Sequence, residues 1–154
     1  GLGMEVSFSE NGDSDWGKRW GKSSLKDQYG DKGPLGAILS GLEHFEGKSL
    51  LVGACDMPLV DEILIRTLVN QRDAGQAVSL FCHGEEERLE PMLSIWEPLS
   101  IPYLREAIRH DQLSLMKLIR SMSIHLIPHD QPQAFLNIND PADYESFIQG
   151  QTGS

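Results

Sequence analysis

The sequence has little basic charge. Its 154 residues include 13 lysines and arginines against 23 aspartates and glutamates, which gives a formal net charge of −10. Neutralising nucleic-acid phosphates requires clustered basic side chains, so this composition argues against a general nucleic-acid-binding protein. The same negative field repels a nucleotide triphosphate unless a magnesium ion or a local basic patch compensates for it.

Cysteines and long apolar runs are also scarce. Only two cysteines are present, Cys55 and Cys82, and each lies in an apolar run. Neither their spacing nor their surroundings suggest a zinc site, so the sequence predicts two free, buried thiols. No run approaches the roughly 18 apolar residues of a membrane span, and no signal peptide is recognisable. Reduced thiols without an export signal are typical of a cytoplasmic protein, and we expect that location.

The length and the hydrophobic pattern predict one α/β domain. We assign it to residues 4–149, because the three residues before Met4 resemble a cloning remnant. Strands are predicted over 5–9, 49–55, 76–82, 92–96 and 124–128, the third and fourth as a hairpin, and helices from Gly33 and over 59–72, 102–110, 113–122 and 141–148. This alternation is typical of a three-layer fold with a mostly parallel sheet.

Asp56 is the strongest single candidate for a functional residue. It follows the continuous apolar run 49–55, which is typical of a parallel strand buried on both faces. Ligands of open α/β folds bind at the carboxyl edge of the sheet, where this carboxylate could hold Mg²⁺ against phosphate oxygens. The alternative is structural, because Asp56 could instead cap the helix that begins near Pro58.

A second candidate region surrounds the first predicted helix. Gly33, Pro34 and Leu35 form its start, and a helix N-terminus preceded by glycine can bind an anion closely. An ordinary helix start explains the same residues. Asp27, on the loop before this helix, could accept hydrogen bonds from a base or sugar, and the alternative is a solvated loop acid.

The third candidate is a pair of amides near the C-terminus. Asn137 and Asn139 lie two residues apart, so in an extended segment they face the same side and could bind a polar ring system. Turn chemistry before Pro141 is the alternative. The five histidines, at positions 44, 83, 110, 125 and 129, are scattered. None pairs with a carboxylate or cysteine at metal-ligand spacing, and we interpret them as surface or strand-end residues.

Four motifs occur in an informative order along the chain. They are DQYGDKGPLGAI at 27–38, LVGACDMP at 51–58, RLEP at 88–91 and NINDPAD at 137–143. This series resembles the MobA-like nucleotidyltransferases, the molybdenum cofactor guanylyltransferases, over about residues 25–148. The resemblance implies a Rossmann-like, three-layer domain that transfers GMP from Mg-GTP to the phosphate of molybdopterin and releases pyrophosphate.

The resemblance also implies roles for the candidate residues. Asp56 matches the aspartate that binds Mg²⁺, and Asp27 matches an aspartate of the guanine-nucleotide site. Gly33, Pro34 and Leu35 match the loop and helix start beside the nucleotide. The molybdopterin side is matched by Asn137, Asn139 and Glu90.

One part of the family pattern has no counterpart here. Members open with a strand and a loop of the type Leu-Ala-Gly-Gly…Arg-Met-Gly…Asp-Lys, which holds the triphosphate. By this comparison the sequence lacks the first strand and the phosphate loop, so we expect an incomplete form with an uncovered sheet edge that permits self-association. Whether the chain is an enzyme stays open. A non-catalytic molybdopterin-binding or assembly module and a related cytidylyltransferase are the alternatives to the guanylyltransferase.

Overall fold

The computed structural model of the chain describes residues 4–10, 16–19, 21–84, 87–138, 145 and 148. Its elements are β1 (Ser7–Glu10), α1 (Trp16–Arg19), β2 (Ser23–Lys26), α2 (Gly33–His44), β3 (Leu50–Gly53), α3 (Glu62–Gln71), β4 (Val78–His83), β5 (Arg88–Trp96), α4 (Ile101–Arg109), α5 (Leu115–Arg120) and β6 (Ile124–Pro128), with 3-10 turns η1 (Pro98–Ser100) and η2 (Pro132–Phe135). Within these residues, no helix is both long enough and apolar enough to cross a bilayer. Most of the helix predicted over 141–148 lies outside them.

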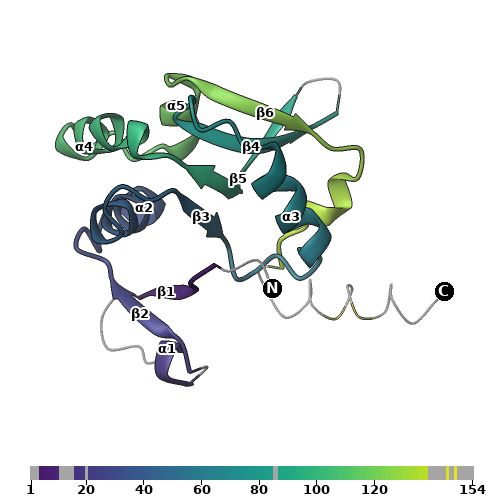
Figure 1. Ribbon diagram of the computed structural model, residues 1–154, viewed down its shortest axis with the longest axis horizontal. Helices are drawn as coiled ribbons and strands as arrows, with labels where there is room; N and C mark the ends of the chain where they lie inside the picture. The colour runs from purple at the N-terminus through teal and green to yellow at the C-terminus, as the bar shows by residue number, and fades with distance from the viewer. Residues whose placement is uncertain are drawn as a thin grey trace.

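A four-stranded sheet forms the centre of the molecule, in the order β3-β5-β4-β6 (Figure 1). The strands β3, β4 and β6 run in one direction, and β5 runs against them. The predicted hairpin is confirmed, since β4 and β5 pair antiparallel with Val78 opposite Trp96. A separate pair of parallel strands, β1 and β2, lies beside α2.

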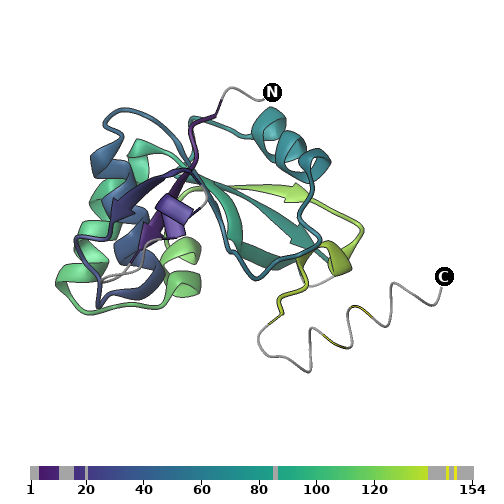
Figure 2. The same cartoon turned by 90° about the horizontal axis from the view of Figure 1, so that it is seen from below.

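Helices cover both faces of the central sheet, which confirms the three-layer α/β fold. Figure 2 shows α3 on one side and α2, α4 and α5 on the other. The core beneath α2, α4 and α5 includes Leu35, Leu39, Trp96, Leu104 and Ile119. The core beneath α3 and η2 includes Leu64, Leu68, Phe81, Ile95 and Phe135.

One expectation about the strands is wrong, and one strand was not predicted. The run 49–55 forms β3, but within the described residues it pairs only with β5, antiparallel, and its side chains are half-buried. A continuous apolar run reports burial and carries no information about the direction of its neighbour. The strand β2 has no counterpart in the prediction, because its sequence SSLK buries only Leu25 and shows no hydrophobic pattern.

Candidate functional site

Asp56 lies in the turn between β3 and α3, just past the carboxyl end of β3. It does not cap α3, because Asp61 does so, with its Oδ1 accepting from the backbone N–H of Leu64 at 2.8 Å. The Oδ1 atom of Asp56 is buried and has no hydrogen-bond partner among the described residues. An unpaired buried carboxylate oxygen costs free energy, so this atom is suited to a cation or to a donor on a ligand.

The surroundings of Asp56 fit a magnesium ion that arrives with a nucleotide. Mg²⁺ commonly takes one or two protein carboxylates and completes its shell with phosphate oxygens and waters. No group of three or more histidine, cysteine, aspartate and glutamate side chains in the described part of the chain could hold a metal by itself. The orphaned Oδ1 of Asp56 is therefore compatible with a shared site and not with an all-protein cage.

The segment that contains Asn137 lies directly beside Asp56. The backbone N–H of Ile138 donates to the backbone oxygen of Asp56 at 2.8 Å. The side chain of Asn137 is exposed, and Asn139 lies outside the described residues. The fold therefore brings together the predicted magnesium residue and the first amide of the predicted pterin pair.

Glu90 belongs to the same region of the sheet. On β5 it is half-buried, and the neighbouring ladder places Gly53 opposite Leu93. The backbone N–H of Ala54 continues this ladder by donating to the oxygen of Met92 at 3.0 Å. Met57, which follows Asp56, packs in one core cluster with Phe81, and Phe81 is the partner of Glu90 in the β4–β5 ladder. Asp56 and Asn137 thus lie together past the end of β3, and Glu90 lies on the adjacent strand β5.

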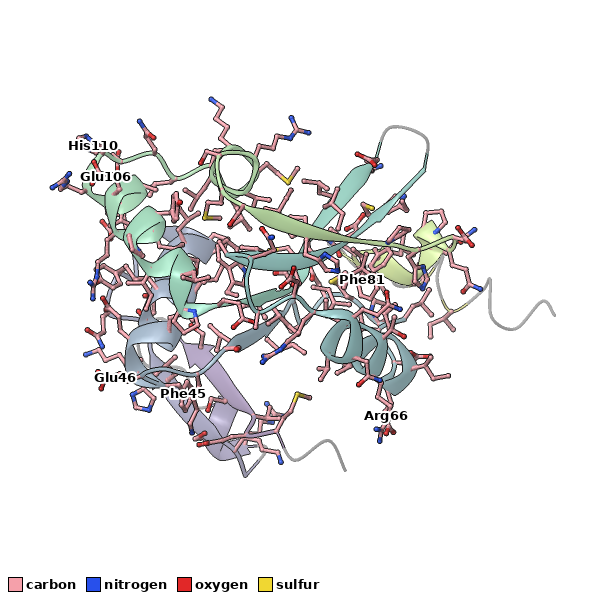
Figure 3. All side chains as sticks on the ribbon, turned by 45° about the horizontal axis from the view of Figure 1, so that its top comes forward. Phe45, Glu46, Arg66, Phe81, Glu106 and His110 are labelled. Atoms are coloured by element: carbon pink, nitrogen blue, oxygen red, sulfur yellow. The ribbon has the colours of Figure 1, made fainter. Side chains whose placement is uncertain are left out.

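Two histidines have carboxylate partners, although His83 ends a strand and His110 is exposed, as predicted. The Nε2 of His83 lies 2.6 Å from the Oε1 of Glu90, across the β4–β5 hairpin. A β-bulge between Leu80 and Phe81 shifts the register of that hairpin, so sequence spacing alone does not reveal the pair. The second is His110, whose Nε2 lies 2.8 Å from the Oε1 of Glu106, and Figure 3 shows this pair on α4, away from Phe81.

Asp27 is a buried residue and not a solvated loop acid. Only 7% of it is exposed, at the junction of β2 and the loop before α2. Its Oδ1 accepts from the backbone N–H of Tyr29 at 2.8 Å and from the Oγ of Ser40 at 3.1 Å. Its Oδ2 is buried without a partner in the described part of the chain. These contacts fix the carboxylate and leave one oxygen for a ligand.

The start of α2 combines a left-handed glycine with a buried side chain. Gly33 has a φ of +57°, which favours glycine, and open space surrounds the position of a Cβ. Leu35 is fully buried in the core, so it could contact a nucleotide only through its backbone. The neighbouring Lys32 is engaged by Asp111 at 3.0 Å, and this hydrogen bond raises the pKa of Lys32.

Asp27 and the start of α2 form a group of their own. No hydrogen bond or ion pair within the described ranges joins this group to Asp56. A further hollow of about 610 Å³ opens between α3 and the residues after β6, lined in part by Asp61, Thr67, His129 and Gln133. No sequence pattern predicts this hollow, and Asp27, Asp56 and Glu90 do not line it.

The two cysteines differ in exposure, which corrects the prediction that both are buried. Cys55 is exposed, because β3 ends at Gly53 and the chain turns outward. Cys82 lies within β4 and is buried. Burial, followed by the charge of Glu87, raises the pKa of the Cys82 thiol. The exposed thiol therefore lies next to Asp56 in sequence, and the buried one lies in the core of the sheet.

Comparison with known proteins gives a consistent match to one family. The family model described as the MobA-like NTP transferase domain matches residues 6–127. A probable molybdenum cofactor guanylyltransferase of Flavobacterium johnsoniae is 29% identical over 71% of this chain and 57% of its own length. Another, from Clostridium perfringens, is 26% identical over 86% of this chain and 70% of its own length. The chain thus spans a little over half of the first relative.

The fold is also that of a solved structure. The crystal structure of molybdopterin-guanine dinucleotide biosynthesis protein A from Archaeoglobus fulgidus superposes with a TM-score of 0.73. The superposition covers 89% of this chain and 72% of that one, at 21% sequence identity. At this identity the likeness establishes the fold.

Proposed function

Because the chain belongs to the MobA-like NTP transferase family, we propose that it serves the transfer of GMP from GTP to molybdopterin. The observation that carries this proposal is the buried, unpartnered Oδ1 of Asp56 at the carboxyl edge of the sheet. The hydrogen bond from Ile138 to Asp56, which draws the Asn137 segment to the same place, supports it. The names of the similar guanylyltransferases agree with this reaction.

In this proposal the chain's own residues bind and orient two substrates. Asp56 holds the magnesium ion that accompanies the triphosphate, and the ion, when bound, neutralises charge on the phosphate oxygens. The free Oδ2 of Asp27 accepts hydrogen bonds from the guanine base, beside the start of α2 at Gly33 and Pro34. The residues assigned to the molybdopterin are Asn137, Asn139 and Glu90.

The chemistry requires placement and no covalent enzyme intermediate. The phosphate of molybdopterin attacks the α-phosphorus of GTP in line, the new P–O bond forms, and the bond to the leaving pyrophosphate breaks. Holding the two reactants in this geometry supplies a large part of the rate enhancement. The fixed carboxylate of Asp27, with two hydrogen bonds to its Oδ1, is suited to such positioning.

A titration with Mg-GTP and, separately, with a pterin phosphate tests the proposal. We expect Asp56→Asn to weaken Mg-GTP binding about tenfold and to leave GTP binding without magnesium unchanged, because the lost interaction is with the ion. Glu62→Gln is the matched control, since it removes one exposed carboxylate of α3 whose partner among the described residues is Arg66, also on the surface. Equal Mg-GTP affinities of wild type and Asp56→Asn would refute the role of Asp56. Pterin binding without GTP binding would identify a molybdopterin-binding module instead.

We further propose that the chain self-associates through the outer edge of β3. In the described part of the chain this strand pairs on one side only, with β5, and an unpaired edge is a template for another strand. Gly53 is exposed at this edge, and a side chain there would meet only Leu93. We expect Gly53→Lys to shift sedimentation towards the monomer, because lysine blocks edge pairing. A wild-type chain that stays monomeric at high concentration would exclude this association.

The cytoplasm is the location that we propose for this activity. The two free cysteines support it, because thiols persist in a reducing compartment. Fractionation of cells that express the tagged chain tests the proposal, and recovery from an oxidising compartment would contradict it.

A further inference from the structure

His83 and Glu90 form a short hydrogen bond beside the candidate site. His83 ends β4, Glu90 lies near the beginning of β5, and the Nε2–Oε1 distance is 2.6 Å. Their side chains are only 10% and 16% exposed. A carboxylate oxygen accepts, so in this contact His83 donates through the tautomer that carries its proton on Nε2. A charge-assisted bond in this partly buried position is stronger and more directional than a surface contact.

The ring of His83 is held from the other side by Phe135. The two rings are stacked, with centroids 5.7 Å apart and planes within 8° of each other. Phe135 is itself buried and packs against Phe81, with centroids 5.3 Å apart. Phe135 is the last residue of η2, and Asn137 follows two residues later. The stacking of Phe135 on His83 therefore holds the β4–β5 hairpin next to the segment that carries the exposed Asn137.

We infer that His83 is a positioning residue that fixes the orientation of Glu90 for the acceptor substrate. His83 occupies Oε1. Oε2 makes no hydrogen bond within the described ranges and is left to accept from the amino and ring N–H groups of a pterin. A free glutamate side chain loses rotamer entropy when it binds a ligand, and an oriented one has already lost it. This inference rests on the proposed function, because it requires a pterin on this side of the site.

A double-mutant cycle on pterin binding tests the inference in the full chain. The probe is a fluorescent pterin that carries a phosphate on its side chain. We expect His83→Phe, which keeps a ring against Phe135 but cannot donate, to weaken binding about tenfold, and Glu90→Gln to weaken it at least as much. His83→Gln restores most of the affinity, because its amide can donate to Glu90. The double variant, His83→Phe with Glu90→Gln, binds no more weakly than Glu90→Gln alone.

The pair His110 and Glu106 on α4 provides the control. It has the same chemistry at 2.8 Å but is about half exposed and lies on another element. We expect His110→Phe and Glu106→Gln to leave pterin affinity unchanged. Melting temperatures of all variants separate a loss of orientation from a loss of fold.

Each outcome decides between the readings. Coupled losses at positions 83 and 90, with rescue by glutamine at 83, support the positioning role. The positioning role is overturned if His83→Phe leaves pterin affinity unchanged, or if the double variant loses the product of the two single fold-losses in affinity. The proposed function stands in both cases. A wild-type chain that does not bind the pterin phosphate overturns the pterin part of the proposed function, and the positioning role with it.

Discussion

Replacing Gly36 with alanine tests how the loop that carries Asp27 is held against α2. An ideal Cβ at position 36 would lie 2.7 Å from the backbone oxygen of Tyr29 and 2.9 Å from its Cβ. These atoms cannot rotate away, so the loop or the helix must shift. Forcing an extra methyl group into such a contact costs about 1–3 kcal/mol. Alanine recovers about 1 kcal/mol of helix propensity, so we expect a net loss of stability of up to about 2 kcal/mol.

Gly41→Ala on the same helix is the matched control. Its Cβ would lie 2.6 Å from the Cδ2 of Leu50, which is the far end of a flexible side chain and can move. The gain in helix propensity then offsets most of the repacking cost, and we expect stability within about 1 kcal/mol of wild type. Urea denaturation followed by circular dichroism measures both variants, and equal slopes confirm that the denatured states are comparable.

Equal stability of the two glycine variants would contradict the anchoring of the Asp27 loop against α2. If Gly36→Ala is as stable as Gly41→Ala, the backbone of Tyr29 does not press on α2, and the loop is not anchored there. If the loop is anchored, its displacement also moves Asp27, whose Oδ1 accepts from the Tyr29 N–H. We therefore expect Gly36→Ala, but not Gly41→Ala, to weaken GTP binding as well.

Three further predictions concern thiols, alkaline stability and the core. A thiol reagent should label the exposed Cys55 rapidly and Cys82 only after unfolding, because Cys82 is buried and burial raises its pKa; two rapid equivalents would contradict this. Burial, followed by a hydrogen bond to Glu43, raises the pKa of Tyr29 above its ordinary value of about 10. The folded state then holds the phenolic proton more tightly, so the stability that this group contributes is present below pH 10 and declines as the pH rises above it. Wild type should therefore lose more stability than Tyr29→Phe between urea melts at pH 9 and about pH 11. Leu68 lies on α3 and is fully buried. Replacing it with alanine should lower the free energy of unfolding by about 2–5 kcal/mol, which a lower urea midpoint would show.

Much of the architecture could be predicted because burial leaves a periodic trace. The stripe that begins at Leu35 predicts α2, and the strand predicted over 124–128 is β6 with the same bounds. Helix starts were harder, since the helix predicted from residue 59 begins at Glu62, after the cap at Asp61. The apolar pattern extends over residues 59–60, and only the cap contact of Asp61 marks where the helix begins.

The residues of the candidate site could be predicted from the sequence, but the contacts that hold them in place could not. Asp56 stands out because an acid directly follows an apolar strand, a local pattern. The pairing of His83 with Glu90 depends on a bulged hairpin register, and the stacking of Phe135 depends on a turn more than fifty positions later. The burial of Asp27 likewise depends on Ser40, from the next helix. Such long-range contacts have no signature in the spacing of residues.

The position of β5 between β3 and β4 has a consequence for biosynthesis. Leu50 pairs with Trp96, which is translated 46 residues later (96 − 50), so β3 cannot join the sheet when it leaves the ribosome. Closing that stretch of chain costs entropy before any ladder bond forms, whereas the β4–β5 hairpin closes locally. We therefore expect the hairpin to assemble first and β3 to add to it afterwards. Until β5 has emerged, the apolar residues of β3 have no strand with which to pair. We expect a chaperone to bind the nascent chain there.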